Sequence, residues 1–179
     1  MPRPRTSETA GRIRAAALEV IAERGVQQAS LREIAERVGI TKPALYYHFA
    51  SREDLLRGLV QPFVDDVEDL LARLEASPPD DPREVLGTYF DVAYRHRDII
   101  RAVMLDPGVL AELNLAAAVD GWRRRLTTLL FGPAPTLSQL TRAAVAIGGL
   151  GDCTVMFTDA SAAELRAATL AAALGALGR

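Results

Sequence analysis

Cysteine, histidine and lysine are scarce in this 179-residue sequence. Cys153 is the only cysteine, so no disulfide can form within the chain, and a reducing compartment is expected. One cysteine and two histidines offer no ligand set typical of zinc, so we expect neither a metal site nor a cofactor. A glycine-rich phosphate loop is also missing, because GGLG lies inside a predicted helix without a preceding strand. These absences argue against an enzyme.

Long hydrophobic runs are missing as well. The apolar runs AAVAIGGLG and ATLAAALGAL are too short and too rich in alanine and glycine to span a bilayer. The basic N-terminus MPRPRTSETAG is not followed by an apolar stretch, so it does not resemble a secretory signal. Hydrophobic residues make up 49% and charged residues 25%, which is typical of a globular protein with a sizeable core. We therefore expect a cytoplasmic protein.

The charge is unevenly distributed along the chain, although the formal net charge is only −2. Residues 1–60 contain ten Lys and Arg against seven Asp and Glu, and the remainder contains eleven against sixteen. A polyanionic partner would therefore meet the N-terminal part.

Signals for β-strands are almost absent, whereas signals for helix starts recur. Five segments begin with Ser, Thr or Asp followed three residues later by Glu, Gln or Asp, a pair that satisfies free N–H groups at a helix start. The predicted helices cover about residues 7–24, 31–38, 42–49, 52–76, 82–104, 108–113, 116–131, 137–158 and 162–177. The predicted fold class is all-α.

Residues 30–49 have the layout of a helix-turn-helix, with two short helices joined by a three-residue turn. Gly39 can take the positive φ that lets the chain reverse sharply in this turn. Leu45 and Phe49 are four residues apart, so they share one face of the second helix and are predicted to be buried. In this motif the second helix lies in the major groove of DNA.

Lys42, Tyr46 and Tyr47 lie away from the buried face of this second helix. Tyrosine hydroxyls can bond to phosphates, and tyrosine rings can contact sugars or thymine methyl groups. Partial burial of these rings is the alternative. Lys42 opposes the helix dipole at the start of the helix, and reaching a phosphate or a guanine edge would explain its position. A solvated surface lysine is the alternative.

The segment LREIAERVGITKPALYYHFASREDLL, residues 31–56, resembles the DNA-binding region of TetR-type transcriptional repressors. The resemblance extends back through AGRIRAAALEVIAERG and covers about the first third of the chain. It implies an N-terminal three-helix DNA-binding domain, residues 1–50, and a C-terminal helical ligand-binding and dimerisation domain, residues 51–179. It also implies a homodimeric, ligand-responsive repressor, which binds a near-palindromic DNA operator and is released by a small, mostly apolar effector.

Carried over by position, the resemblance implies a set of DNA contacts on and around the second helix of the motif. These residues are Arg32, Thr41, Lys42, Pro43, Ala44, Tyr46, Tyr47, His48 and Arg52. Arg52 stands where the family commonly carries a phosphate-binding lysine. Ala44 offers only a methyl group, so base discrimination would depend on Lys42, Arg32 and Tyr47.

The segment TLSQLTRAAVAIGGLGDCTVMF is apolar almost all round, which indicates burial on more than one side. Each of its glycines weakens a helix by up to about 1 kcal/mol, a cost that close approach of another helix would explain. With the alanine-rich last segment, it is predicted to form a four-helix dimer interface; packing within one chain is the alternative. The predicted interface residues are Ala144, Ile147, Gly148, Gly151, Leu165 and Ala172.

A mostly apolar effector pocket is predicted from aromatic and methionine residues on three helices. These residues are Tyr89, Phe90, Tyr94, Met104, Trp122, Met156 and Phe157. Side chains of this kind at helical spacing also serve as ordinary core. A helical small-molecule-binding or partner-binding protein without DNA binding is the alternative function.

Overall fold

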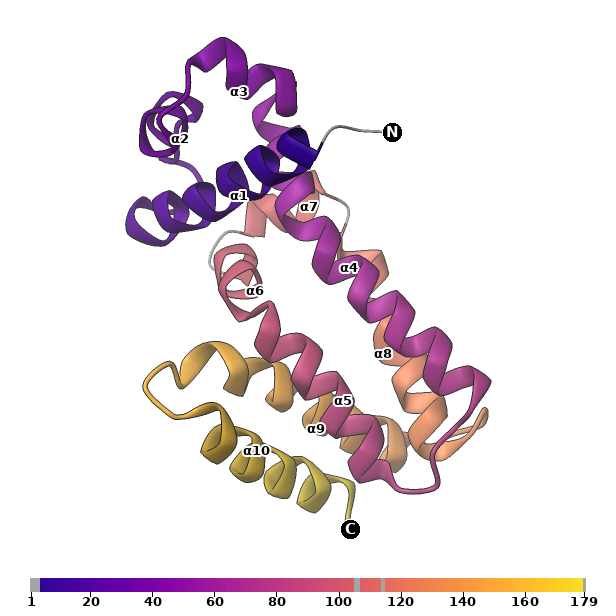
Figure 1. Cartoon of the computed structure of the whole chain (residues 1–179). Helices are drawn as coiled ribbons and strands as arrows, with labels where there is room; N and C mark the ends of the chain where they lie inside the picture. The colour runs from indigo at the N-terminus through magenta and orange to yellow at the C-terminus, as the bar shows by residue number, and fades with distance from the viewer. Residues whose placement is uncertain (1–3, 105–106, 114, 179) are drawn as a thin grey trace. The chain divides into compact units, whose positions relative to one another are not determined.

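The computed structural model describes residues 4–104, 107–113 and 115–178 (Figure 1). These residues are helical throughout apart from short connections, which confirms the predicted all-α class. The helices are α1 (Pro4–Arg24), α2 (Leu31–Val38), α3 (Lys42–His48), α4 (Arg52–Ala76), α5 (Pro82–Arg95), α6 (Arg97–Met104), α7 (Pro107–Glu112), α8 (Leu115–Phe131), α9 (Leu137–Met156) and α10 (Ala162–Leu177). None of the helices within these described ranges could cross a membrane.

The helix starts follow from the capping residues of the sequence. The Thr136 and Gln139 side chains each accept a hydrogen bond from the other's backbone N–H, which completes a capping box at α9. Ser30 and Ser161 accept from the backbone N–H three residues on, so they cap α2 and α10. Asp81 accepts instead from the N–H of Arg83, two residues on.

The predicted single helix 82–104 is wrong, because the chain breaks at His96 into α5 and α6. The backbone of His96 has φ −102° and ψ 13°, outside the helical region. Its Nε2 lies 2.8 Å from Oδ2 of Asp66 on α4, which also accepts a 2.7 Å hydrogen bond from Arg95. The pKa of Asp66 is lowered by the bond with His96 and then by the bond with Arg95. A contact with a residue 30 positions away fixes this break, so local periodicity does not show it.

The chain forms two compact units that do not follow sequence order. One comprises residues 1–62 and 98–114, and the other comprises residues 63–97 and 115–179. The division into residues 1–50 and 51–179 stays a prediction, and the compact units place the first division after Pro62 instead.

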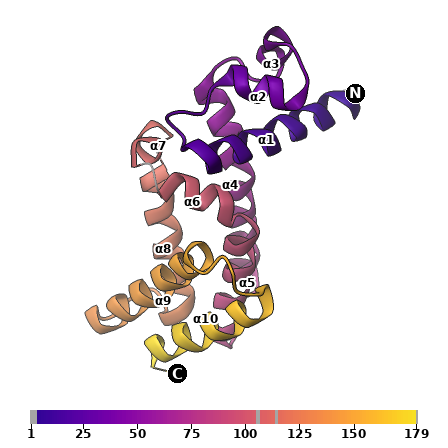
Figure 2. The same ribbon diagram turned by 90° about the vertical axis from the view of Figure 1, so that its left-hand side faces the viewer.

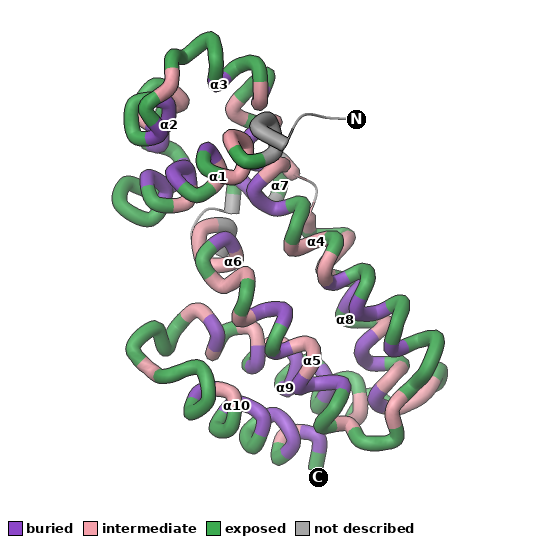
Figure 3. The backbone as a smooth tube through the Cα atoms, viewed as in Figure 1, coloured by how far each residue is buried: buried purple, intermediate pink, exposed green. Residues whose placement is uncertain are grey.

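Each unit has its own apolar interior. In the first unit, α1, α2 and α3 pack on one another through fully or nearly fully buried side chains such as Ile13, Ile34 and Leu45. In the second unit, α9 and α10 lie side by side (Figure 2), and both pack on α5. Figure 3 shows buried and exposed residues alternating along α9 and α10, so each helix also has an open face.

Candidate nucleic-acid interface

The second helix of the motif, α3, is fixed by its start and by its buried face. The Thr41 hydroxyl oxygen accepts a hydrogen bond from the N–H of Ala44 at 3.3 Å, which caps the helix. Leu45 is fully buried, and Phe49, which follows the helix, is almost fully buried. A Cβ added to Gly58 on α4 would lie only 2.8 Å from Cε1 of Phe49, so this glycine makes room for the ring. Sequence reasoning missed the role of Gly58.

The opposite face of α3 is open to solvent. Thr41, Pro43 and Ala44 are exposed, and Tyr47 is 80% exposed although it is a large aromatic residue. The Lys42 Nζ lies 5.7 Å from the centroid of the Tyr46 ring. The Tyr47 ring meets the half-buried His48 ring edge-on at 5.4 Å. This face therefore presents one ammonium group and two phenol groups, the chemistry that contacts phosphates, sugars and bases.

Arg32 on α2 is exposed but is already paired within its own helix. Its Nε donates to Oε1 of Glu36 at 2.8 Å, and this bond raises the pKa of Arg32. The pair is one helical turn apart and both side chains are mostly exposed, so it is weak in water. A DNA phosphate could therefore replace Glu36 as the partner of Arg32.

Arg52, another predicted DNA contact, has a partner inside the protein. Its Nη2 donates to the carbonyl oxygen of Val26 at 2.7 Å, and the residue is half-buried at the start of α4. The family resemblance implied a phosphate contact here, which stays a prediction, and no signal in the sequence links Arg52 to the connection between α1 and α2.

The residues of the predicted effector pocket fall into two groups. Phe90 and Trp122 are buried in the core of the second unit, and Tyr89 and Tyr94 pack against that core. Trp122 Nε1 donates to Glu68 at 2.6 Å, and the Phe63 ring meets Trp122 edge-on at 5.5 Å, a contact that sequence reasoning missed. The core therefore accounts for the burial of all four predicted side chains.

The other predicted pocket residues are not gathered with this core. Met156 and Phe157 are 69% and 54% exposed at the end of α9. The side chain of Met104 lies outside the described part of the structure. The predicted set therefore does not form a single lining.

The predicted dimer residues also divide by burial. Ile147 and Leu165 are buried in the chain's own core, so their burial needs no partner. Ala144 and Ala172 are exposed, and Gly148 and Gly151 are half-buried. A Cβ added to either glycine would meet nothing within 4 Å, so contacts within one chain do not require glycine there.

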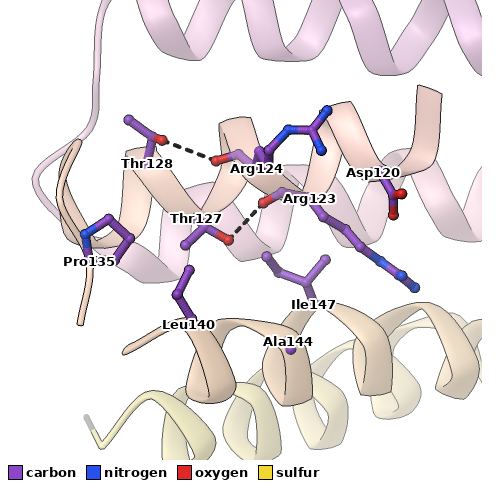
Figure 4. A pocket seen from close by; sticks show the side chains of 9 residues that line it. All are labelled: Asp120, Arg123, Arg124, Thr127, Thr128, Pro135, Leu140, Ala144 and Ile147. Atoms are coloured by element: carbon purple, nitrogen blue, oxygen red, sulfur yellow. Dashed lines mark hydrogen bonds between the residues drawn. The ribbon is translucent and has the colours of Figure 1, made fainter. Parts of the chain in front are cut away.

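A groove of about 580 Å³ lies between α8 and α9 (Figure 4). Leu140, Ala144, Ile147 and Pro135 give it apolar walls. The Thr127 and Thr128 hydroxyls donate to carbonyls of their own helix, at 2.7 and 3.1 Å, so they can offer a ligand acceptor oxygens only. Figure 4 shows the Arg123 side chain running along the groove. The charged groups available to a ligand are Arg123, Arg124 and Asp120 at its rim.

Comparison with known proteins places the α2–α3 motif in a sequence family. Residues 13–59 match the family described as bacterial regulatory proteins, tetR family. The transcriptional activator FasR of Mycolicibacterium smegmatis is 42% identical over 117 residues, which cover 61% of this chain and 53% of that protein. The regulator AcrR of Shigella flexneri is 34% identical over 79 residues, 44% of this chain and 37% of AcrR. The chain thus spans about half or less of these curated relatives.

Solved structures share the fold over nearly the whole chain. The ketosteroid transcriptional regulator KstR2 of Mycobacterium tuberculosis superimposes with a TM-score of 0.77 at 18% identity, over 94% of this chain and 93% of that one. A transcriptional regulator from Aquifex aeolicus VF5 gives a TM-score of 0.73 at 20% identity, over 92% and 96%. Identities this low establish the fold alone.

Proposed function

Because this chain belongs to the TetR family of transcriptional regulators, we propose that it is a ligand-responsive repressor that binds a near-palindromic DNA operator as a homodimer. A small, mostly apolar effector would release it from the operator. In helix-turn-helix dimers, the two recognition helices enter major grooves roughly 34–36 Å apart, which is why such operators are near-palindromic.

The division of α3 into two faces is the observation that carries this proposal. Leu45 and Phe49 anchor the helix in the core of the first unit. Lys42, Tyr46 and Tyr47 are exposed and are not part of that core. Exposed aromatic residues beside a cation are suited to contact a nucleic-acid backbone, because hydroxyl and ammonium groups donate to phosphates and rings pack on sugars. Lys42 makes no ion pair within the described residues, so its charge is available to a base or phosphate.

The homodimer is supported by the distribution of exposed apolar side chains. Among the described residues, every exposed large hydrophobic residue outside α3 lies on α9 or at its C-cap. These residues are Leu137, Leu140, Val145, Met156 and Phe157. Gly148 lies midway along this face and offers a place where a second helix could approach closely. We therefore place the dimer contact on α9 and the neighbouring exposed face of α10.

We place the effector in the second unit, whose core is rich in aromatic residues. Phe63 contacts the rings of Trp122 and His96, and in a separate group Phe90 stacks on Tyr94, whose ring Arg97 covers. Burial raises the pKa of the Tyr89 hydroxyl in the same region. One structural neighbour, FadR of Bacillus subtilis, was solved with stearoyl-CoA, and another is described as a ketosteroid regulator. A stearoyl chain and a ketosteroid are apolar, although the coenzyme A part of stearoyl-CoA is highly polar.

Activation of transcription is the second candidate, because FasR is described as an activator. The regulators KstR2 of Mycobacterium tuberculosis and Rhodococcus jostii are described as repressors. The same DNA-binding face serves either outcome, which depends on where the operator lies relative to the promoter.

Selection of duplexes from a randomised pool, followed by footprinting, tests the proposed function. We expect a near-palindromic site whose affinity falls steeply with salt, since phosphate contacts release counterions. Binding equal to that of a scrambled duplex at every salt concentration would favour a helical binding protein without operator recognition. Transcription in vitro from a promoter carrying the site then separates repression from activation.

A further inference from the structure

Two arginines from different helices bond to backbone carbonyls, one at the end of α2 and one in the connection between α1 and α2. Arg12 of α1 donates from Nη2 to the carbonyl oxygen of Val38, the last residue of α2, at 2.8 Å. Arg52 of α4 donates from Nη2 to the carbonyl oxygen of Val26, in the connection that leads into α2, at 2.7 Å. All four residues belong to the first compact unit.

Both carbonyls belong to buried residues, where an unpaired acceptor is costly. The Val26 carbonyl also accepts a longer bond, at 3.3 Å, from the N–H of Ala29, so Arg52 adds a shorter, charged donor to it. At the end of α2, Gly39 N–H donates to Glu36 and Ile40 N–H to Ala35, so these bonds leave the Val38 carbonyl to Arg12. A guanidinium beside a helix C-terminus also complements the negative end of the helix dipole. Bonds from charged donors are about twice as strong as neutral ones.

The position of Arg52 is otherwise unfavourable, because a cation at the first residue of α4 opposes the dipole of that helix. A phosphate would explain the position, and so does the Val26 carbonyl, which the structure provides. We propose that Arg12 and Arg52 are positioning residues, which hold the α2–α3 pair in the orientation that binds DNA. In this proposal Arg52 bonds to the Val26 carbonyl and does not contact a phosphate. This inference depends on the DNA binding proposed above.

The consequence is a division of labour among the basic residues of the first unit. Lys42 and Arg32 are placed to meet DNA directly, whereas Arg12 ties the end of α2 to α1 and Arg52 ties the α1–α2 connection to α4. A small rotation of α2 would also move α3, since the three-residue turn between them is short and both helices are anchored by buried side chains.

The test compares Arg12→Met and Arg52→Met with Arg57→Met. The methionine keeps an apolar stem but removes the charge and the donor. Arg57 lies on α4 near Arg52, is exposed and, in the part of the chain that the structure describes, pairs with Glu53 of its own helix, so it controls for the loss of one charge. The measurements are affinity for the selected duplex against salt concentration, and amide hydrogen exchange of residues 30–49 without DNA.

We expect both Arg12→Met and Arg52→Met to weaken binding to the selected duplex by about ten-fold, the size of a lost bond to a charged donor. The slope of log affinity against log salt should match that of the wild type. Exchange of residues 30–49 should be faster in both variants and unchanged in Arg57→Met.

A salt slope that falls by about one in Arg52→Met, with unchanged hydrogen exchange, would overturn the inference, because that is the signature of a lost phosphate contact. Unchanged exchange of residues 30–49 in Arg12→Met would overturn the role of Arg12. If the wild type shows no preference for any duplex, the proposed function fails. The exchange data still decide in that case whether the two arginines position α2.

Discussion

The α2–α3 pair and the α9–α10 pair are held by the same kinds of contact but present different surfaces. In the α2–α3 pair, Ser30 and Thr41 cap the helices, and Arg12 bonds to the carbonyl oxygen of the last residue of α2. In the α9–α10 pair, Thr136 and Ser161 cap the helices, and Arg142 of α9 donates to the carbonyl oxygen of Leu177, the last residue of α10, at 3.0 Å. Buried apolar side chains pack both pairs.

The difference lies in the exposed surface of each pair. The α3 surface offers a cation and phenol groups, which suit the proposed polyanionic partner. The α9 surface offers large apolar side chains and glycine, which suit the proposed contact with a second copy of the chain. The comparison teaches that helix pairs with similar internal contacts can present surfaces of opposite character.

The largest expected effect comes from breaking the buried face of α3. Leu45→Ala removes a fully buried side chain and should lower the free energy of unfolding by about 2–5 kcal/mol, with loss of DNA binding. Denaturant unfolding followed by circular dichroism measures the change. Leu137→Ala is the matched substitution on the exposed face of α9 and should change the free energy of unfolding of the monomer by less than about 0.5 kcal/mol. Similar losses for both leucines would contradict the assignment of the two faces.

The next effect comes from placing a charge on the α9 face. Val145→Asp should weaken the homodimer by about 2–3 kcal/mol, because the carboxylate would be buried without a partner. Sedimentation equilibrium measures the dimer dissociation constant. Ala116→Asp, at an exposed position in the first turn of α8, is the control and should leave association unchanged. An unchanged dissociation constant for Val145→Asp would move the dimer contact away from α9.

Substitutions on the exposed face of α3 test whether its residues contact bases or phosphates. Lys42→Ala should cost about 1–3 kcal/mol of binding to the selected duplex and much less on a scrambled duplex, as expected for a base contact. Tyr46→Phe should weaken binding to both duplexes alike, since a hydroxyl bond to a phosphate carries no sequence information. Gel-shift titrations on the two duplexes measure both variants. Equal losses on both duplexes for Lys42→Ala would remove its role in specificity.

The smallest effect concerns a polar contact within the second unit. The Trp122 N–H and then the Arg125 guanidinium lower the pKa of Glu68 below its ordinary value. A lowered folded-state pKa means that the stabilisation is complete above the unfolded pKa, about 4.3, and is lost as the pH falls through the folded value. Glu68→Gln should therefore cost about 0.5 kcal/mol near pH 7, because the group is largely exposed, and less near pH 3.

Trp122 is the only tryptophan, so its fluorescence reports this contact directly. Thermal unfolding of the wild type and Glu68→Gln at both pH values, followed by this signal, measures the difference. A difference that grows as the pH falls would contradict the sign of the effect. Glu53→Gln, which removes an exposed ion pair with Arg57 on α4, is the control.

Several features of the fold could be predicted because they depend on neighbours along the chain. The bounds of α2 and α10 were predicted to the residue, since Ser30, Gly39 and Ser161 act on backbone groups within one turn. The burial of Leu45 and Phe49 followed from their spacing of four residues. The break at His96 and the space that Gly58 leaves for Phe49 could not be predicted, because both depend on contacts between different helices.

The candidate site divides in the same way. The sequence by itself determined that α3 has an apolar face and a face with Lys42, Tyr46 and Tyr47, because helical periodicity assigns residues to faces. Only the tertiary structure decided that Arg52 bonds to Val26, and that Ile147 and Leu165 belong to the chain's own core. The physical reason is that a long side chain chooses among partners brought together by folding, and that choice leaves no local trace in the sequence.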